Sequence, residues 1–398
     1  MTPIPPLPDR LARLSTTEYP QFSAEEMTRR RGVITEMLRN ARCDHLVFCG
    51  ANRVGSIVQW LTQWPVTAEA VGVCSPGDRD ALFVQFVNHA ELASIIACEA
   101  DVAWGGTSSI ASAIEVLRKR GARAGRVAFI GPISYAQHAA LASAFGPPAD
   151  LNQVYTRTRQ VKSDEELDWM RIGAHFADLG MAALRDNLRP GISEQELGAL
   201  IEQAYVPLGG GHYIHFVGTT SMHDPAVPVP RQFPSRRCIA NGDVVCAEIS
   251  ASFWDYPGQV LRSFTVGERP NQLYRDLYAA AEAAFDAIAH VLRAGATSLQ
   301  VIEASGVIEQ AGFTIIDDLL HGFGGGYLPP ILGTKSRPAG PVPPEPFRRG
   351  QTVVVQPNVV THNRKAGVQV GELLVITDTG VETLHQYPPG FETVSIAG

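Results

Sequence analysis

Apolar and polar positions alternate along residues 20–145 with two different periods, which distinguish helices from strands. Ser23 stands three residues before Glu26 at the start of an amphipathic segment, and this spacing is typical of a capping box that opens a helix. Short apolar runs between polar segments predict buried strands. The elements predicted after the first helix are strands at 46–49, 81–86 and 126–130 and a helix at 109–118. Helices that alternate with buried strands indicate an α/β domain whose helices cover a sheet.

The pattern changes after a Pro-containing segment at 147–152, where the sequence reads as a linker. Ser163 and Glu166 have capping-box spacing, and they begin an amphipathic helix that extends to about Asn187. We therefore divide the chain into an α/β domain at 1–155 and a second domain at 156–398.

The second domain contains one arrangement twice. A helix at 164–187 leads through the turn Leu-Arg-Pro-Gly-Ile-Ser into a short helix, and an Ala-rich helix at 274–292 leads through Leu-Arg-Ala-Gly-Ala-Thr into another. Two copies of one unit imply a pseudo-two-fold α+β domain, with helices on one face of a curved antiparallel sheet. The other face of such a sheet is free to line a central pocket.

Composition and charge exclude several classes of function. The chain has 398 residues and a formal charge of −7, without a Lys/Arg stripe, so we expect no nucleic-acid partner. No run approaches the ~20 apolar residues of a membrane span, and the N-terminus lacks a signal-peptide pattern, so we expect a cytoplasmic protein. The six cysteines form no CxxC pair, which predicts reduced thiols and excludes a zinc finger.

Segments of the second domain resemble, in order, motifs of the creatinase, aminopeptidase P and methionine aminopeptidase superfamily. These segments are 159–167, 241–245, 262–267, 321–324 and 367–377. The resemblance covers about residues 20–390 and is closest in layout to creatinase. It implies a pita-bread fold for 156–398, a small-molecule substrate and a homodimer.

The resemblance also implies where metal ligands would stand. Metal-dependent members bind two divalent ions through two Asp, one His and two Glu, because two close cations require several anionic oxygens. The matching positions here are Glu248, Gln259, His321, Gln356 and Gly371. Two carboxylates are thus replaced by neutral amides and one by glycine. We therefore predict that the protein needs no metal cofactor; the alternative is one divalent ion on Glu248 and His321.

A metal-free pocket of this kind would use acid/base chemistry. His223, in Met-His-Asp-Pro, matches the catalytic His of creatinase, and an imidazole suits this role because its pKa lies near the working pH. Glu248 in a dry pocket would have a raised pKa and could act as an acid. We predict His223, Glu248 and His321 as catalytic residues. Cys246 is either a nucleophile or a buried thiol of the sheet.

Further residues are predicted to contact the substrate. Gln259 and Gln356 offer both donors and acceptors to a neutral or anionic group. Glycine-containing segments at 209–215 and 324–332 would shape the entrance. The predicted substrate-binding residues are Gln259, Arg262, Gln356, Tyr213, His215, Tyr327 and Glu372.

Three functions remain open on this basis. The first is a metal-independent, creatinase-like hydrolase or lyase that cleaves a C–N or related bond of a small polar molecule. The second is an Xaa-Pro peptidase-like metallohydrolase with a reduced metal site. The third is a non-catalytic pita-bread protein that binds a partner, since fold does not dictate function. The main prediction is the first.

Overall fold

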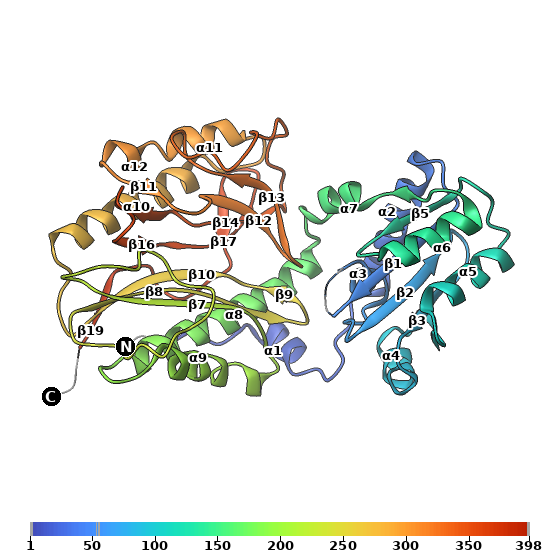
Figure 1. The fold of residues 1–398 in the computed structure, drawn as a ribbon, viewed down its shortest axis with the longest axis horizontal. Helices are drawn as coiled ribbons and strands as arrows, with labels where there is room; N and C mark the ends of the chain where they lie inside the picture. The colour runs from blue at the N-terminus through green and yellow to red at the C-terminus, as the bar shows by residue number, and fades with distance from the viewer. Residues whose placement is uncertain (1–2, 53, 55, 396–398) are drawn as a thin grey trace. The chain divides into compact units, whose positions relative to one another are not determined.

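The computed structural model describes residues 3–52, 54 and 56–395, and the chain forms two compact units (Figure 1). The N-terminal unit comprises Glu18–Arg159, and the C-terminal unit comprises 160–398 together with residues 1–17. The sequence analysis assigned these first residues to the N-terminal domain. They pack in the C-terminal unit because the Arg10 guanidinium donates to both carboxylate oxygens of Asp168, at 2.5 and 2.6 Å.

The N-terminal unit is an α/β domain built on one mixed sheet, whose strands follow the order β4-β3-β2-β1-β5-β6. The strands are β1 (His45–Ala51), β2 (Glu69–Cys74), β3 (Asp80–Val84), β4 (Ala100–Trp104), β5 (Val127–Ile130) and β6 (Ala149–Asp150). The helices are α2 (Ala24–Asn40), α3 (Ile57–Thr62), η1 (Val87–His89), α4 (Ala90–Ile96), α5 (Ser109–Lys119), α6 (Tyr135–Phe145) and α7 (Asn152–Arg159). All three predicted strands and both predicted helices of this region are present.

The C-terminal unit repeats a long helix followed by a short one. Its helices are α1 (Asp9–Ser15), α8 (Asp164–Asn187), α9 (Glu194–Gln203), η2 (Val206–Leu208), α10 (Gln272–Val291), α11 (Ser298–Ala304) and α12 (Val307–Gln310). Reciprocal capping boxes start α8, α9 and α11, so the serine or threonine at each start satisfies backbone N–H groups that the helix leaves free. Among the described residues, no helix is long and apolar enough to cross a membrane.

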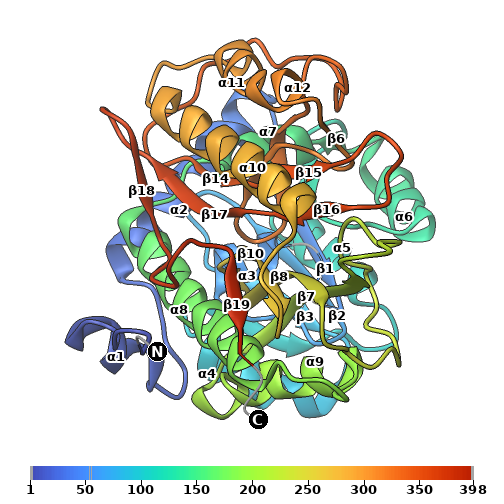
Figure 2. The ribbon, with the colours of Figure 1, turned by 90° about the vertical axis from the view of Figure 1, so that its left-hand side faces the viewer.

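The main sheet of this unit joins the two halves. Its order is β13-β12-β14-β17-β10-β8-β7, and the halves meet where β10 pairs with β17. Its strands are β7 (Gly211–Ser221), β8 (Asp243–Phe253), β9 (Tyr256–Pro257), β10 (Val260–Val266), β12 (Leu320–Phe323), β13 (Tyr327–Leu332), β14 (Thr352–Val355), β17 (Gly371–Ile376), β18 (Val381–Thr383) and β19 (Glu392–Val394). A small sheet adds β11 (Thr314–Ile315), β15 (Asn358–Val360) and β16 (Gly367–Gln369). Figure 2 shows the long helices α8 and α10 beside this layer of strands.

The long helices pack closely on the strands and leave the opposite face for a pocket. At Gly180 of α8, an added Cβ would lie 3.3 Å from the side chain of Ile249, so Ile249 of β8 faces this helix. Glu248 is its neighbour along the strand and therefore faces the other side. A Cβ at Gly258 would lie 2.2 Å from the Cα of Ala174 in α8, and this close approach fixes the turn that carries Gln259.

Candidate functional site

A pocket of about 400 Å³ lies on the C-terminal unit, on the face where Glu248 points. This volume is typical of a small-molecule site. Its walls come from β7, β8, β12 and β13 and from the segments beside β10, β12 and β14. The lining residues are Tyr213, Ile214, Phe216, Glu248, Gln259, Asp317, Asp318, His321, Phe323, Tyr327 and Gln356.

Carboxylates and amides form a hydrogen-bonded chain across the pocket. Nε2 of Gln259 donates to Oε1 of Glu248 at 2.8 Å and to Oε1 of Gln356 at 3.3 Å. Nε2 of Gln356 donates to Oδ1 of Asp318 at 3.1 Å. Among the described residues, Oε1 of Gln259 and Oδ2 of Asp318 are buried without a hydrogen-bond partner. Orphaned buried acceptors indicate that a ligand supplies the missing donors or a cation.

The two buried carboxyl groups resist ionisation. Burial raises the pKa of Glu248 to about 8, and the nearby carboxylates of Asp317 and Asp318 add to this effect. Burial raises the pKa of Asp318 to about 7, and the negative charge of Asp317 is the second cause of this rise. The pocket is therefore electrostatically suited to a positively charged ligand, which would relieve the repulsion among these acids.

His321 is held as a neutral imidazole with a defined tautomer. Its Nδ1 lies 3.0 Å from the carbonyl oxygen of Gly322, which can only accept, so Nδ1 carries the proton and Nε2 carries the lone pair. Burial lowers its pKa to about 4. A neutral His whose second nitrogen donates to a backbone carbonyl is the usual arrangement of a metal-ligating imidazole.

Aromatic rings form one side of the pocket. Tyr327 stacks on His321 with 4.1 Å between ring centroids, and Phe323 meets His321 edge-on at 5.5 Å. Tyr213 lies edge-on to Phe323 at 5.7 Å. Together with Ile214, these rings make up most of the apolar part of the pocket lining.

The structure brings six of the predicted site residues to this pocket: Glu248, His321, Gln259, Gln356, Tyr213 and Tyr327. His223 is not among the residues that line it. Its ring is about two-thirds exposed, and its Nε2 lies 3.0 Å from a carboxylate oxygen of Glu268. His215 lies on the side of β7 toward Tyr205, whose hydroxyl is 2.9 Å from its Nε2.

Arg262 and Glu372 are bonded to each other away from the pocket. Nη2 of Arg262 lies 2.6 Å from Oε2 of Glu372, and Nη1 donates to the carbonyl of Gly371 at 2.8 Å. Glu372 therefore points to one face of β17, and a side chain at the neighbouring position 371 would point to the other face. Cys246 lies on the same strand face as Glu248 but is enclosed in the hydrophobic core, and burial raises its pKa to about 11, which disfavours a thiolate nucleophile.

Sequence reasoning missed Asp317 and Asp318. Both precede β12 and stand a few residues before His321, between the apolar pairs Ile315–Ile316 and Leu319–Leu320. Asp317 is exposed but Asp318 is buried, and a buried acid inside an apolar segment costs free energy unless a ligand or partner compensates it. That pattern was the available signal, but Asp317 and Asp318 match none of the superfamily positions considered.

The donor set of the pocket fits one cation and does not fit a pair. The amides of Gln259 and Gln356 direct N–H groups toward Glu248 and Asp318, where a second ion would have to bind, and Gly371 offers no ligand atom. Glu248, Asp318 and His321 nevertheless supply two carboxylates and an imidazole lone pair, the residue types that suit a single divalent ion. Among the described residues they do not form a group of three ligand atoms within 4.8 Å of one another, so these side chains would have to move together to share an ion. Asp318 also has the orphaned oxygen described above.

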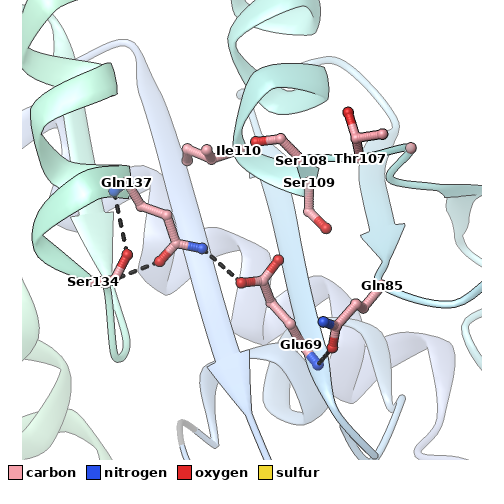
Figure 3. A pocket seen from close by; sticks show the side chains of 9 residues that line it. Glu69, Gln85, Thr107, Ser108, Ser109, Ile110, Ser134 and Gln137 are labelled. Carbon is pink, nitrogen blue, oxygen red and sulfur yellow. Dashed lines mark hydrogen bonds between the residues drawn. The ribbon is translucent and has the colours of Figure 1, made fainter.

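A second cavity, of about 290 Å³, lies in the N-terminal unit (Figure 3). It is lined by hydroxyl and amide groups around Glu69, whose Oε2 accepts from Nε2 of Gln137 at 2.7 Å. Its lining residues include one carboxylate and no imidazole. It therefore lacks the donors that the larger pocket of the C-terminal unit combines.

Comparison with known proteins places these features in context. The family model described as metallopeptidase family M24 matches residues 168–378. The chain is 26% identical over 260 residues to a probable dipeptidase PepE of Mycobacterium tuberculosis, covering 62% of this chain and 64% of that protein. It is 21% identical over 240 residues to the Xaa-Pro dipeptidase of Pyrococcus furiosus, covering 59% and 65%. The matches thus span just under two thirds of the length of these relatives.

Solved structures show the same fold over nearly the whole chain. The X-Pro aminopeptidase of Thermotoga maritima aligns with a TM-score of 0.78 at 17% identity, covering 92% of this chain and 99% of that one. The dipeptidase PepE of Mycobacterium ulcerans aligns with a TM-score of 0.75 at 21% identity, covering 94% and 100%. The predicted two-domain architecture with a pita-bread C-terminal half is confirmed.

Proposed function

Because the chain belongs to metallopeptidase family M24, we propose that it hydrolyses dipeptides of the Xaa-Pro class in the pocket around Glu248, Asp318 and His321. The observation that carries this proposal is that one pocket is lined by two buried carboxyl groups, a neutral imidazole and several aromatic rings. The superfamily resemblance found in the sequence is correct.

Two predictions from the sequence are wrong. Relatives named dipeptidase and Xaa-Pro dipeptidase, and a family described as metallopeptidases, contradict the creatinase-like hydrolase or lyase and favour the peptidase alternative. The same findings contradict the expectation of no cofactor. The physical reason for the error is that the five superfamily positions alone hold one carboxylate, whereas Asp317 and Asp318 bring further acids from a neighbouring segment.

Glu248, Asp318 and His321 would hold the cation after their side chains move to within coordination distance of one ion. When bound, a divalent ion there supplies polarisation of the scissile carbonyl and a water of lowered pKa. The side chains of this pocket orient the ligand atoms. Nδ1–H of His321 donates to the carbonyl oxygen of Gly322, which leaves the lone pair on Nε2 free to accept. Gln259 and Gln356 orient the two carboxylates through their N–H groups, so the acids are fixed before a substrate arrives.

The remaining groups suit a dipeptide. The orphaned Oε1 of Gln259 can accept from the N-terminal ammonium of a substrate, and the acidic character of the pocket favours that charge. An apolar prolyl ring can pack against the rings of Tyr213, Phe323 and Tyr327, whose faces and edges offer apolar contact. We propose from the family resemblance alone that the protein is a homodimer, which light scattering would test.

Hydrolysis of a dipeptide panel tests the proposal. Protein dialysed against EDTA should be inactive, and MnCl₂, CoCl₂ or ZnCl₂ should restore cleavage of Ala-Pro or Leu-Pro in preference to Ala-Ala or Leu-Ala. Asp318→Asn should lower kcat/KM by roughly 100-fold or more, because the ion loses a charged ligand. Asp378→Asn is the matched control, since that side chain is 71% exposed.

Two results would contradict the proposal. One is the absence of cleavage of every dipeptide with each of the three metals. The other is hydrolysis that survives complete removal of metal with an unchanged rate.

A further inference from the structure

Glu202, His212 and His215 form the one cluster of at least three potential metal-ligating side chains found among the described residues. We propose that these three residues bind a transition-metal dication such as Zn²⁺, at a site separate from the dipeptide pocket. Glu202 lies near the end of α9, and both histidines lie at the start of β7, which packs against α9 (Figure 1).

A bulge in β7 brings the two histidines together. His212 pairs with Ala251 of β8 and Ile214 with Ser250, so Tyr213 is an extra residue without a direct partner in that ladder. His215 then pairs with Ile249, two residues from Ala251 on the same face of β8. In a regular strand, residues three apart point to opposite faces. The bulge therefore gives both imidazoles one direction.

The ligand atoms have the separations of a coordination sphere. Nδ1 of His212 and Nδ1 of His215 are 3.0 Å apart, and Oε1 of Glu202 lies 3.2 and 3.7 Å from them. Tetrahedral zinc with ligands at about 2.0–2.1 Å requires ligand-to-ligand distances of about 3.4 Å. The three atoms can thus share one ion with side-chain shifts of only a few tenths of an ångström.

A second residue orients the buried histidine. The hydroxyl of Tyr205 lies 2.9 Å from Nε2 of His215, and Tyr205 is itself fully buried. A phenol oxygen can accept from Nε2–H, which leaves the lone pair on Nδ1, facing the other two ligands. His215 is itself buried, so this contact holds its ring in one orientation.

The fourth position of the site opens to solvent. The side chains of His212 and Glu202 are 50% and 47% exposed, so a water molecule can complete the tetrahedron. Two imidazoles and one carboxylate select borderline dications such as Zn²⁺, Co²⁺ or Ni²⁺ over Mg²⁺ and Ca²⁺. Tyr213 and Ile214 lie between the two histidines in sequence and line the dipeptide pocket. An ion bound by His212 and His215 would therefore restrict the movement of these two lining residues.

Zinc binding to the full chain in an Asp318→Asn background tests the site, since that substitution weakens the pocket ion. ZnCl₂ should bind with one tight equivalent by titration calorimetry and raise Tm, whereas MgCl₂ should do neither. His212→Ala in the same background should weaken zinc binding by roughly 100-fold. His212 is chosen because it is half exposed, whereas replacing His215 risks misfolding.

The matched control is His223→Ala, which breaks an exposed His–Glu pair that belongs to no three-ligand cluster among the described residues. This variant should keep the tight zinc equivalent. Tyr205→Phe should weaken zinc binding roughly tenfold or more, as loss of an orienting partner does. The proposal is overturned if His212→Ala binds zinc as tightly as its background, or if the Asp318→Asn protein binds no zinc. Neither result depends on whether dipeptides are hydrolysed.

Discussion

The side-chain amide of Gln259 donates to the Glu248 carboxylate, with 2.8 Å between Nε2 and Oε1. A neutral amide thus occupies a position at which metal-dependent members of the superfamily have an aspartate ligand. Gln259→Glu adds a negative charge with little change in shape, and we expect it to tighten binding of Mn²⁺ to the metal-depleted protein by roughly tenfold or more. Titration calorimetry measures this affinity.

The control for this substitution is Gln300→Glu, which changes an exposed capping residue of α11 and should leave Mn²⁺ affinity unchanged. Equal affinities for wild-type protein and Gln259→Glu would contradict a cation site at Glu248.

Glu248 should reduce the stability of the metal-depleted protein at alkaline pH. Its pKa is about 8 in the folded state against 4.5 ordinarily, so between these values the folded chain keeps a proton that the unfolded chain has released. The free energy of unfolding therefore falls as pH rises through this window, by up to about 1.4 kcal/mol per pH unit. Glu248→Gln replaces the titrating carboxyl group by an amide and should therefore abolish this fall in stability with rising pH. In EDTA, its Tm should exceed that of wild type at pH 8.5 and match it at pH 5.

The same variant should be inactive toward dipeptides with metal restored. A Tm for Glu248→Gln that stays below wild type at both pH values would show that the carboxyl group is not under electrostatic strain.

The fold was predictable because local signals agreed with tertiary packing. Ser193 and Thr297 cap the short helices at equivalent places in the two halves, Ser163 caps the first long helix, and the repeated Gly turn follows each long helix. These interactions span three or four residues and are therefore visible in the sequence.

The site was only partly predictable because its members meet across the sheet. Asp318 reaches Gln356 from a segment that precedes β12, and neither spacing nor residue type reveals that contact. The direction of Glu372 depends on the register of β17, in which Gly371 pairs with Leu261 and Glu372 with Val260. The bulge at Tyr213, which turns His215 away from the pocket, is likewise a property of the paired strands.

Gly371 should not tolerate a side chain. A Cβ there would lie 2.3 Å from the carbonyl oxygen of Val355 and 2.9 Å from the Cα of Gln356, both of which are backbone atoms. Gly371→Ala should therefore lower the free energy of unfolding by roughly 1–3 kcal/mol. Gly380→Ala, where a Cβ meets nothing within 4 Å, is the control and should be nearly neutral in urea unfolding.

Replacement of His223 should leave catalysis intact. Its ring is 66% exposed and contacts Glu268 rather than any residue of the pocket. We expect kcat/KM of His223→Ala for an Xaa-Pro dipeptide to stay within about twofold of wild type, because a surface ion pair contributes little. A loss of roughly 100-fold would instead give this histidine the catalytic role that the sequence resemblance implied.

Arg262 and Glu372 should stabilise the fold without contacting substrate. Nη2 of Arg262 lies 2.6 Å from Oε2 of Glu372, and the two side chains are 2% and 14% exposed. Arg262 also donates to the carbonyls of Gly371 and Tyr387 at 2.8 and 2.9 Å, so its loss orphans several acceptors at once. Arg262→Ala should therefore cost about 3–5 kcal/mol in urea unfolding.

Glu372→Gln keeps a hydrogen-bonding side chain and should cost less, and the double variant should be less destabilised than the sum of the two changes. If either residue instead binds the substrate, Glu372→Gln would raise KM for an Xaa-Pro dipeptide while stability stayed unchanged.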